Sequence, residues 1–312
     1  MDIDQALRAT DKMMLEVVGS DVSVLEEASR HIIGAGGKRI RPRLLFLGYK
    51  ALGGDDLARA VPVASAIEIV HTATLVHDDI NDHGVTRRGR VTVNERWGRT
   101  FALLTGDFLF TKVYWLMAPY GDLNITLAEA TVALVEGETL QAQAARDNNL
   151  NREVYQKIVA KKTASLFRAA GMLGAQLAGA KQEYVDALGE FGFFLGLAFQ
   201  IVDDILDLTG DPTLMGKAAG VDLPQGKGVG AAVVYGAQGG NGIATAAPTT
   251  EAEGDPFAPI KRRLIEGGAV EEGRQMAQVI AAQALAALNK LPESPYRAEL
   301  ARLVDVVINR DH

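Results

Sequence analysis

Cysteine is absent from this chain of 312 residues, which excludes disulfides, zinc–thiolate sites and thiol nucleophiles and leaves the redox compartment undetermined. The first residues, MDIDQALRATDKMMLEVV, carry no basic segment before an apolar core, unlike a secretory signal. The longest nearly uncharged apolar run, Phe191–Val202, is too short to cross a bilayer. We therefore expect a soluble, cytoplasmic chain with no transmembrane segment.

Alternating β-branched runs are also lacking, and helical spacing takes their place. Apolar residues recur every three or four positions in five stretches: Ala66–Ile80, Thr126–Gln143, Arg152–Ala178, Glu183–Leu208 and Glu271–Asn289. The chain is 48% hydrophobic, so its length allows one large core or two ordinary ones. The pattern predicts an all-α protein.

One segment differs in composition from the rest. Residues 228–259 are rich in Gly, Ala, Thr and Pro, and they carry no charge before Glu251. Such a composition is typical of a long flexible loop, which is either a lid or a disordered insertion.

Two aspartate clusters each follow an apolar, helix-like run. HDDIND ends one run with Asp78 and Asp82, and VDDILD ends another with Asp203 and Asp207. Residues four apart lie on one helix face, so His71, Leu75, Asp78 and Asp82 form a row. Close carboxylates beside a core repel one another, and cations relieve that repulsion. One cluster alone fits a solvated helix end, but two favour a shared site for Mg²⁺, which prefers oxygen ligands.

Basic side chains accompany both acidic clusters. The net charge of −7 argues against general nucleic-acid binding. Each basic group alone would fit a solvated or nucleic-acid-binding patch, but beside two aspartate clusters the groups favour diphosphate binding. They occur in GGKRIRPR (Gly36–Arg43), RRG (Arg87–Gly89) and KKT (Lys161–Thr163), and as Lys217 and Lys227, each after a glycine. Neither of those lysines completes a phosphate-binding GxxxxGK[ST] loop, so a nucleotide site is disfavoured.

Taken together in this order, the motifs resemble the all-trans isoprenyl diphosphate (polyprenyl) synthase family, and medium- and long-chain members in detail. They are GGKRIRP, EIVHTATLVHDDINDHGVTRRG, TGDFLF, EGETLQ, KKTASLF, FQIVDDILD and GKxxGxDLxxGK. The resemblance covers nearly the whole chain. It implies a single domain over residues 1–312, with mostly antiparallel helices around a deep central cavity, and usually a homodimer. It also implies transient membrane contact during product release as one option.

The resemblance assigns roles residue by residue. Asp78, Asp82 and Asp203 would bind Mg²⁺, on the order of three ions per site, supported by Asp79, Asp204 and Asp207. The allylic diphosphate would be held by Arg87, Lys162, Thr163, Gln200, Lys217 and Lys227. Isopentenyl diphosphate would be held by Lys38, Arg41, His71 and Arg88. After Lys227 the chain departs from the family pattern, with GVGAAVVYGAQGG in place of a threonine-leucine-proline helix start.

Small residues precede the first aspartate cluster by about one turn. Ala73 and Thr74, with Val70 a turn deeper, would form the wall that the growing product meets, and short-chain relatives tend to place aromatic residues there. A helix turn of about 5.4 Å is close to one isoprene unit. We therefore expect a product longer than C20, about C30–C50.

Several alternatives stay open. A short-chain farnesyl or geranylgeranyl diphosphate synthase would share the motifs but close the wall. A non-catalytic partner subunit would generally lose the aspartates, and a terpene cyclase would usually carry a different second motif. A metal-dependent phosphohydrolase could use His77 and Asp78, but it needs further suitably placed histidines, and the chain has only four others.

Overall fold

A computed structural model describes residues 1–147, 149, 151–209, 262 and 265–310. The segment 228–259, Lys217 and Lys227 lie outside the described residues. The described chain is built from helices joined by short turns, as expected from the sequence. The helices are α1 (Ile3–Val17), α2 (Ser23–Ile33), α3 (Ile40–Ala51), α4 (Val61–Asn81), α5 (Val93–Trp97), α6 (Arg99–Met117), α7 (Leu123–Arg146), α8 (Arg152–Val159), α9 (Ser165–Leu177), α10 (Gln182–Thr209), α14 (Ala269–Leu288) and α15 (Pro295–Ile308).

Shorter elements join or extend these helices. Single 3₁₀ turns precede α4 (η1, Leu57–Arg59) and α7 (η2, Ala118–Tyr120), and a π-helical turn, η3 (Ala160–Ala164), separates α8 from α9. One antiparallel hairpin, β1 (Thr86–Arg87) with β2 (Arg90–Val91), was not foreseen from the sequence, because two-residue strands leave no alternating pattern. The all-α prediction is otherwise confirmed.

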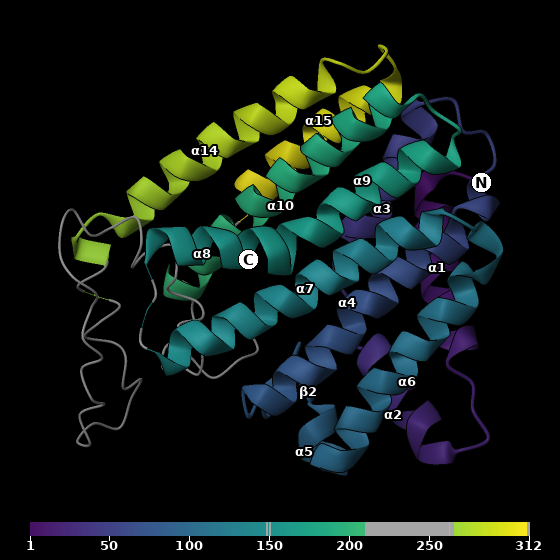
Figure 1. The fold of residues 1–312 in the computed structure, drawn as a ribbon, viewed down its shortest axis with the longest axis vertical. Coiled ribbons are helices and arrows are strands. Elements are labelled where there is room, and N and C mark those ends of the chain that lie inside the picture. The colour runs from purple at the N-terminus through teal and green to yellow at the C-terminus, as the bar shows by residue number, and fades with distance from the viewer. Residues whose placement is uncertain (148, 150, 210–261, 263–264, 311–312) are drawn as a thin grey trace.

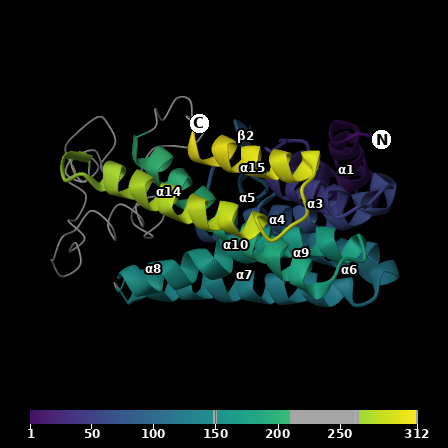
Figure 2. The ribbon, with the colours of Figure 1, turned by 90° about the horizontal axis from the view of Figure 1, so that it is seen from above.

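The long helices share one general direction and pack side by side. Figure 1 shows α4, α6, α7, α9, α10 and α14 inclined along the same diagonal, and Figure 2 shows α14 and α15 on the opposite side of the molecule from α7 and α8. Each of the five periodic stretches found in the sequence falls on these helices. One hydrophobic core draws on residues from α1 through α15, and a smaller cluster joins α8, α10 and α14.

Helices α9 and α10 approach closely because glycine lies at their contact. A Cβ added to Gly192 of α10 would lie 2.3 Å from the carbonyl oxygen of Phe167 in α9. No real Cβ tolerates that distance, so the backbones can meet only with glycine there. This contact fixes α10, and with it the second aspartate cluster, against α9.

Three of the described helical stretches are long and apolar enough to cross a membrane, judged by length and composition alone: Leu57–Asn81, Arg99–Tyr120 and Gln182–Thr209. The sequence criterion of an uncharged run was too narrow to find them. Their most apolar windows are 78%, 39% and 61% buried within the protein, respectively. Helix α6 therefore differs from α4 and α10 in leaving much of its apolar surface exposed.

Candidate active site

The first aspartate cluster ends helix α4. His71, Leu75, Asp78 and Asp82 are each partly exposed, in agreement with the predicted row. Most other residues between His71 and Asp82 are buried, although His77 is also partly exposed and Asn81 is exposed. Asp79 lies off the row and is 2% exposed. The Arg87 guanidinium donates from Nε to its Oδ1 at 2.8 Å. The outer carboxylates of Asp78 and Asp82 thus face outward, and the inner one is neutralised by the protein.

The hairpin after α4 places the two arginines in different directions. Arg88 and Gly89 occupy its two-residue turn with φ of 51° and 71°, the left-handed geometry of tight hairpin turns. Arg87, one residue earlier, reaches back to Asp79. Arg88 donates through Nη1 to the carbonyl oxygen of Gly36 in the glycine loop before α3. The hairpin therefore joins the first aspartate cluster to the GGKRIRPR segment.

The second aspartate cluster lies near the end of α10 and has the same division of roles. Asp204 is 4% exposed and accepts hydrogen bonds from Tyr155 Oη at 2.6 Å and Gln200 Nε2 at 2.9 Å. Asp203 remains partly exposed and pairs with Arg310 at 2.8 Å. The inner carboxylate is again buried and held by protein donors, whereas the outer one is partly exposed and paired with Arg310.

The π-helical turn η3 connects the two clusters. Lys162 Nζ lies 2.6 Å from Glu138 and 3.7 Å from Asp78, and Thr163 donates to Gln200, the partner of Asp204, at 2.8 Å. A π turn shifts side chains away from α-helical register, and such turns are frequent at functional sites. The turn packs closely against α7 because Gly137 of α7 faces it. A Cβ added to Gly137 would lie 2.5 Å from the backbone nitrogen of Lys162.

Acidic neighbours keep Lys162 charged. Burial acts to lower the pKa of Lys162, but Asp78, Glu138 and Asp82 outweigh it, so the pKa is raised. The lysine also donates to Gln141 Oε1 at 3.0 Å. Lys162 is thus a fixed cation beside the outer carboxylates of the first cluster.

The residues assigned to isopentenyl diphosphate also gather at one place. Burial lowers the pKa of Lys38, Arg41 and Arg88. Arg41 and Arg88 both interact with the charge of Glu68, and Lys38 and Arg41 both interact with that of Asp203. Arg41 stacks on the Phe167 ring at 4.6 Å and feels the charge of Asp203. Lys38 lines a cavity of about 650 Å³ between α3 and α15, with Arg310 beside it. The basic cluster therefore adjoins the second aspartate cluster.

His71 lies within this positive environment. Burial and then the charges of Arg41, Arg88, Arg87 and Arg39 lower its pKa well below 6.5. The imidazole is accordingly neutral at pH 7, so it can donate one hydrogen bond without adding a charge.

The described residues do not form a ready-made metal cage. Within them, no group of three or more histidine or carboxylate side chains is close enough to hold an ion. Asp78, Asp82 and Asp203 are still the outer, partly exposed members of their clusters, and oxygen donors suit a divalent cation that shares its coordination with a ligand. Ala73, Thr74 and Val70 are buried in α4, and whether they form the product wall stays a prediction.

Six residues in this region escaped the sequence assignments: Arg39, Glu68, Glu138, Gln141, Tyr155 and Arg310. Glu138 and Gln141 belong to the EGETLQ motif. Two polar residues three positions apart lie on one helix face, and this spacing could have indicated that both belong to the site. No sequence pattern indicated Arg310, because its partner Asp203 is far away in the sequence.

Comparison with known proteins agrees with this geometry. A family model described as polyprenyl synthetase matches residues 22–242. This chain belongs to the polyprenyl synthetase family. It is 35% identical to octaprenyl diphosphate synthase of Escherichia coli strain K12, over 98% of this chain and 96% of that protein. It is 32% identical to geranylgeranyl diphosphate synthase of Methanosarcina mazei, over 92% and 90%.

A solved structure extends the family likeness to the fold. The polyprenyl synthase from Caulobacter crescentus, complexed with calcium and isoprenyl diphosphate, superposes with a TM-score of 0.89 at 33% identity, covering 99% of this chain and 96% of that one. The fold is thus that of the polyprenyl synthases. Membership in the polyprenyl synthetase family makes the chain a prenyltransferase.

The lowered pKa of His71 predicts a pH dependence of stability. In the unfolded chain His71 takes up a proton near pH 6.5, whereas in the folded chain its lowered pKa keeps it unprotonated at that pH. The free energy of unfolding therefore falls as the pH drops below 6.5. Between pH 7 and 5.5 we expect the free energy of unfolding to fall by about 1 kcal/mol less in His71→Gln than in the wild type. Urea unfolding at several pH values measures this, with the exposed His83→Gln as control. An unchanged pH slope in His71→Gln would contradict a neutral imidazole.

Proposed function

We propose that the chain condenses isopentenyl diphosphate head-to-tail with an allylic diphosphate and releases pyrophosphate. The observation that carries this proposal is the bridge made by Lys162 and Thr163. Lys162 contacts Asp78 of one cluster, and Thr163 contacts the Gln200–Asp204 pair of the other. A diphosphate at this bridge would meet donors from η3 and from α10 at once.

Divalent cations complete the proposed allylic pocket. Asp78, Asp82 and Asp203 would hold Mg²⁺, and the Caulobacter crescentus polyprenyl synthase was crystallised with calcium and isoprenyl diphosphate. Bound Mg²⁺ would supply charge stabilisation to the departing diphosphate. Asp79 and Asp204 have a different task, because they are buried and held by protein donors.

The chain's own side chains then divide the work. Arg87, Lys162, Thr163 and Gln200 would stabilise negative charge on the departing allylic diphosphate, which favours breaking its C–O bond. On the other side Lys38, Arg41, His71 and Arg88 would hold isopentenyl diphosphate so that its double bond attacks the allylic carbon. A proton is then lost, and the released pyrophosphate is the proposed acceptor.

We propose a product of about C30–C50. The octaprenyl diphosphate synthase of Escherichia coli supports a long chain, whereas the geranylgeranyl diphosphate synthase relative represents the shorter alternative. Ala73 is fully buried in α4, one turn before the first cluster, and its methyl group obstructs little. A product following α4 would pass this position early.

The second copy of a homodimer fits the exposed apolar surface of α6 and α7. This surface, called the α6–α7 face, comprises Phe101, Leu103, Leu104, Tyr114 and Trp115 of α6 and Ile125, Val132 and Val135 of α7. Trp115 is 70% exposed and Tyr114 is 67% exposed. Exposed apolar patches of this kind mark interaction sites, and symmetric pairs are the commonest assemblies.

The reaction itself is tested by incubating the purified chain with isopentenyl diphosphate and an allylic primer. We expect pyrophosphate release that chelation abolishes and Mg²⁺ restores, and a loss of at least about 100-fold in Asp78→Asn, because an outer carboxylate is removed. Mass spectrometry of the products gives their length. Release from the allylic substrate alone would favour a hydrolase or cyclase, and no release would favour a partner subunit.

The product wall is tested separately with Ala73→Phe. Because an aromatic ring would obstruct the path of the product, we expect chains shortened by several isoprene units, each spanning about one helix turn of ~5.4 Å. Chromatography and mass spectrometry of the products measure the shift. Ala73→Ser, which hardly changes side-chain volume, serves as the control. An unchanged length distribution in a folded Ala73→Phe variant would remove Ala73 from the wall.

The dimer is tested with Trp115→Glu. A charge in the middle of a buried apolar interface is costly, so we expect the variant to become monomeric at micromolar concentration. Light scattering coupled to size-exclusion chromatography measures the mass. Val279→Glu, on the exposed side of α14 and 58% exposed in the native chain, should not change it. If wild-type protein is monomeric but sediments with lipid vesicles, the α6–α7 face serves membrane contact instead.

A further inference from the structure

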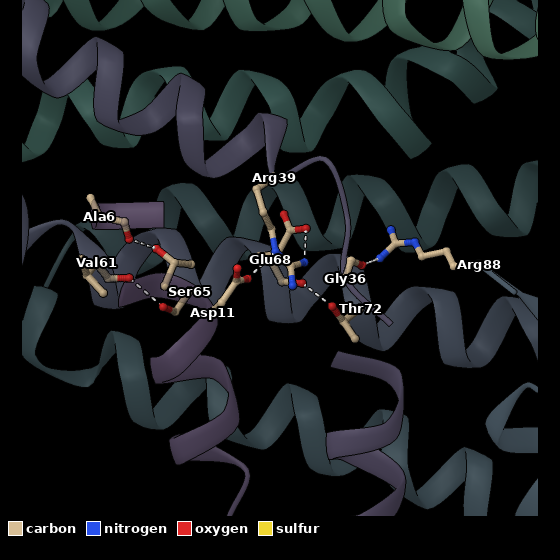
Figure 3. A network of polar contacts seen from close by, with 10 residues as sticks. Ala6, Asp11, Gly36, Arg39, Val61, Ser65, Glu68, Thr72 and Arg88 are labelled. Carbon is tan, nitrogen blue, oxygen red and sulfur yellow. Dashed lines mark hydrogen bonds and ion pairs between the residues drawn. The ribbon is translucent and has the colours of Figure 1, made fainter. Parts of the chain in front are cut away.

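Arg39 points into the protein, although in the sequence it stands between Lys38 and Arg41, which are both assigned to isopentenyl diphosphate. It has a left-handed φ of 48°, which bulky residues rarely adopt, and its side chain is 8% exposed. Its guanidinium donates to Glu68 Oε1 at 2.8 Å and to Asp11 Oδ1 at 2.6 Å (Figure 3). Lys38 precedes it, and Arg41 lies two residues later in the first turn of α3. A change in the direction of Arg39 would therefore move both.

Glu68 supplies the opposite charge from within helix α4. Its carboxylate is buried, and its Oε2 accepts no hydrogen bond. A lone buried carboxylate is very costly, so Glu68 depends on the nearby guanidinium groups. It acts to raise the pKa of three of them, Arg39, Arg41 and Arg88. Glu68 is thus the shared counter-charge of the basic cluster.

The glycine loop is fixed at both ends by these charges. Arg88 holds the Gly36 carbonyl at its start, and Glu68 holds Arg39 at its end (Figure 3). Residues 36–39 belong to no helix or strand, and Gly36 has a φ of 74°, so the loop has no regular structure of its own to hold its shape. Its geometry depends on the two arginine contacts.

We propose that Glu68 and Arg39 are positioning residues for isopentenyl diphosphate. Glu68 holds Arg39 in its left-handed turn and offsets the repulsion between the arginines, so that Lys38 and Arg41 face the diphosphate. This inference rests on the proposed function. Neither residue touches the substrate, and the allylic pocket at Asp78, Lys162 and Thr163 does not depend on them.

Glu68→Gln distinguishes this role from its alternatives, because glutamine keeps the shape and removes the charge. We expect the KM for isopentenyl diphosphate to rise about tenfold or more, with the KM for the allylic substrate changed less than about twofold. A simple loss of negative charge would instead strengthen anion binding and lower the first KM. A purely structural pair would lower stability and leave both KM values unchanged. Either of these results overturns the proposal.

Three further variants control for misfolding and for indirect effects. Arg39→Lys keeps the charge but loses the fork that joins Glu68 to Asp11, so it should show the same selective rise in KM. In the double variant Arg39→Lys/Glu68→Gln the rise should not exceed that of either single variant, because both residues belong to one contact. Asp4→Asn removes the exposed Asp4–Arg43 pair between α1 and α3 and should change neither KM.

The wild-type reaction separates the two levels of inference. If wild-type protein forms no condensation product, the proposed function fails and the KM comparison does not arise. If it condenses normally and both Glu68→Gln and Arg39→Lys keep the wild-type KM for isopentenyl diphosphate, only the positioning role fails.

Discussion

The active-site end of the molecule depends on protein donors that stabilise two buried carboxylates. Asp79 and Asp204 each occupy the inner position of an aspartate pair, where an isolated charge would cost several kcal/mol. The hairpin supplies Arg87 to one, and α8 and α10 supply Tyr155 and Gln200 to the other. The inner aspartates thereby anchor their helix ends. The outer aspartates next to them gain a fixed direction from helical geometry alone.

Each charged cluster contains one group of the opposite sign before any substrate binds. On the acidic side, Lys162 is held among Asp78, Asp82 and Glu138, which keep it protonated. On the basic side, Glu68 stands among arginines, and His71 stays neutral because those arginines oppose its protonation. The acidic cluster thus contains one cation, Lys162, and the basic cluster contains one anion, Glu68. Such preorganised groups lose little energy in reorientation when a charged ligand arrives.

The sequence was sufficient for features with a helical period and insufficient for contacts through turns. The row from His71 to Asp82 followed from spacings of three and four, and the structure confirms its exposure. Arg39 could not be distinguished from Lys38 and Arg41, because only its left-handed backbone turns it inward. The Tyr155–Asp204 bond joins helices whose packing depends on glycine contacts and a π turn, neither of which has a reliable sequence signature.

Helix α4 unites these requirements along one rigid element. Glu68, His71 and Asp78 follow one another within three turns, so the counter-charge, the neutral donor and the first carboxylate have a fixed order along the axis. The buried face of the same helix carries Ala73. Because all four positions share one helix, a change in α4 packing would alter substrate binding and product length together. Point substitutions are therefore sharper probes than helix deletions, since each alters one position while the pitch holds the others in place.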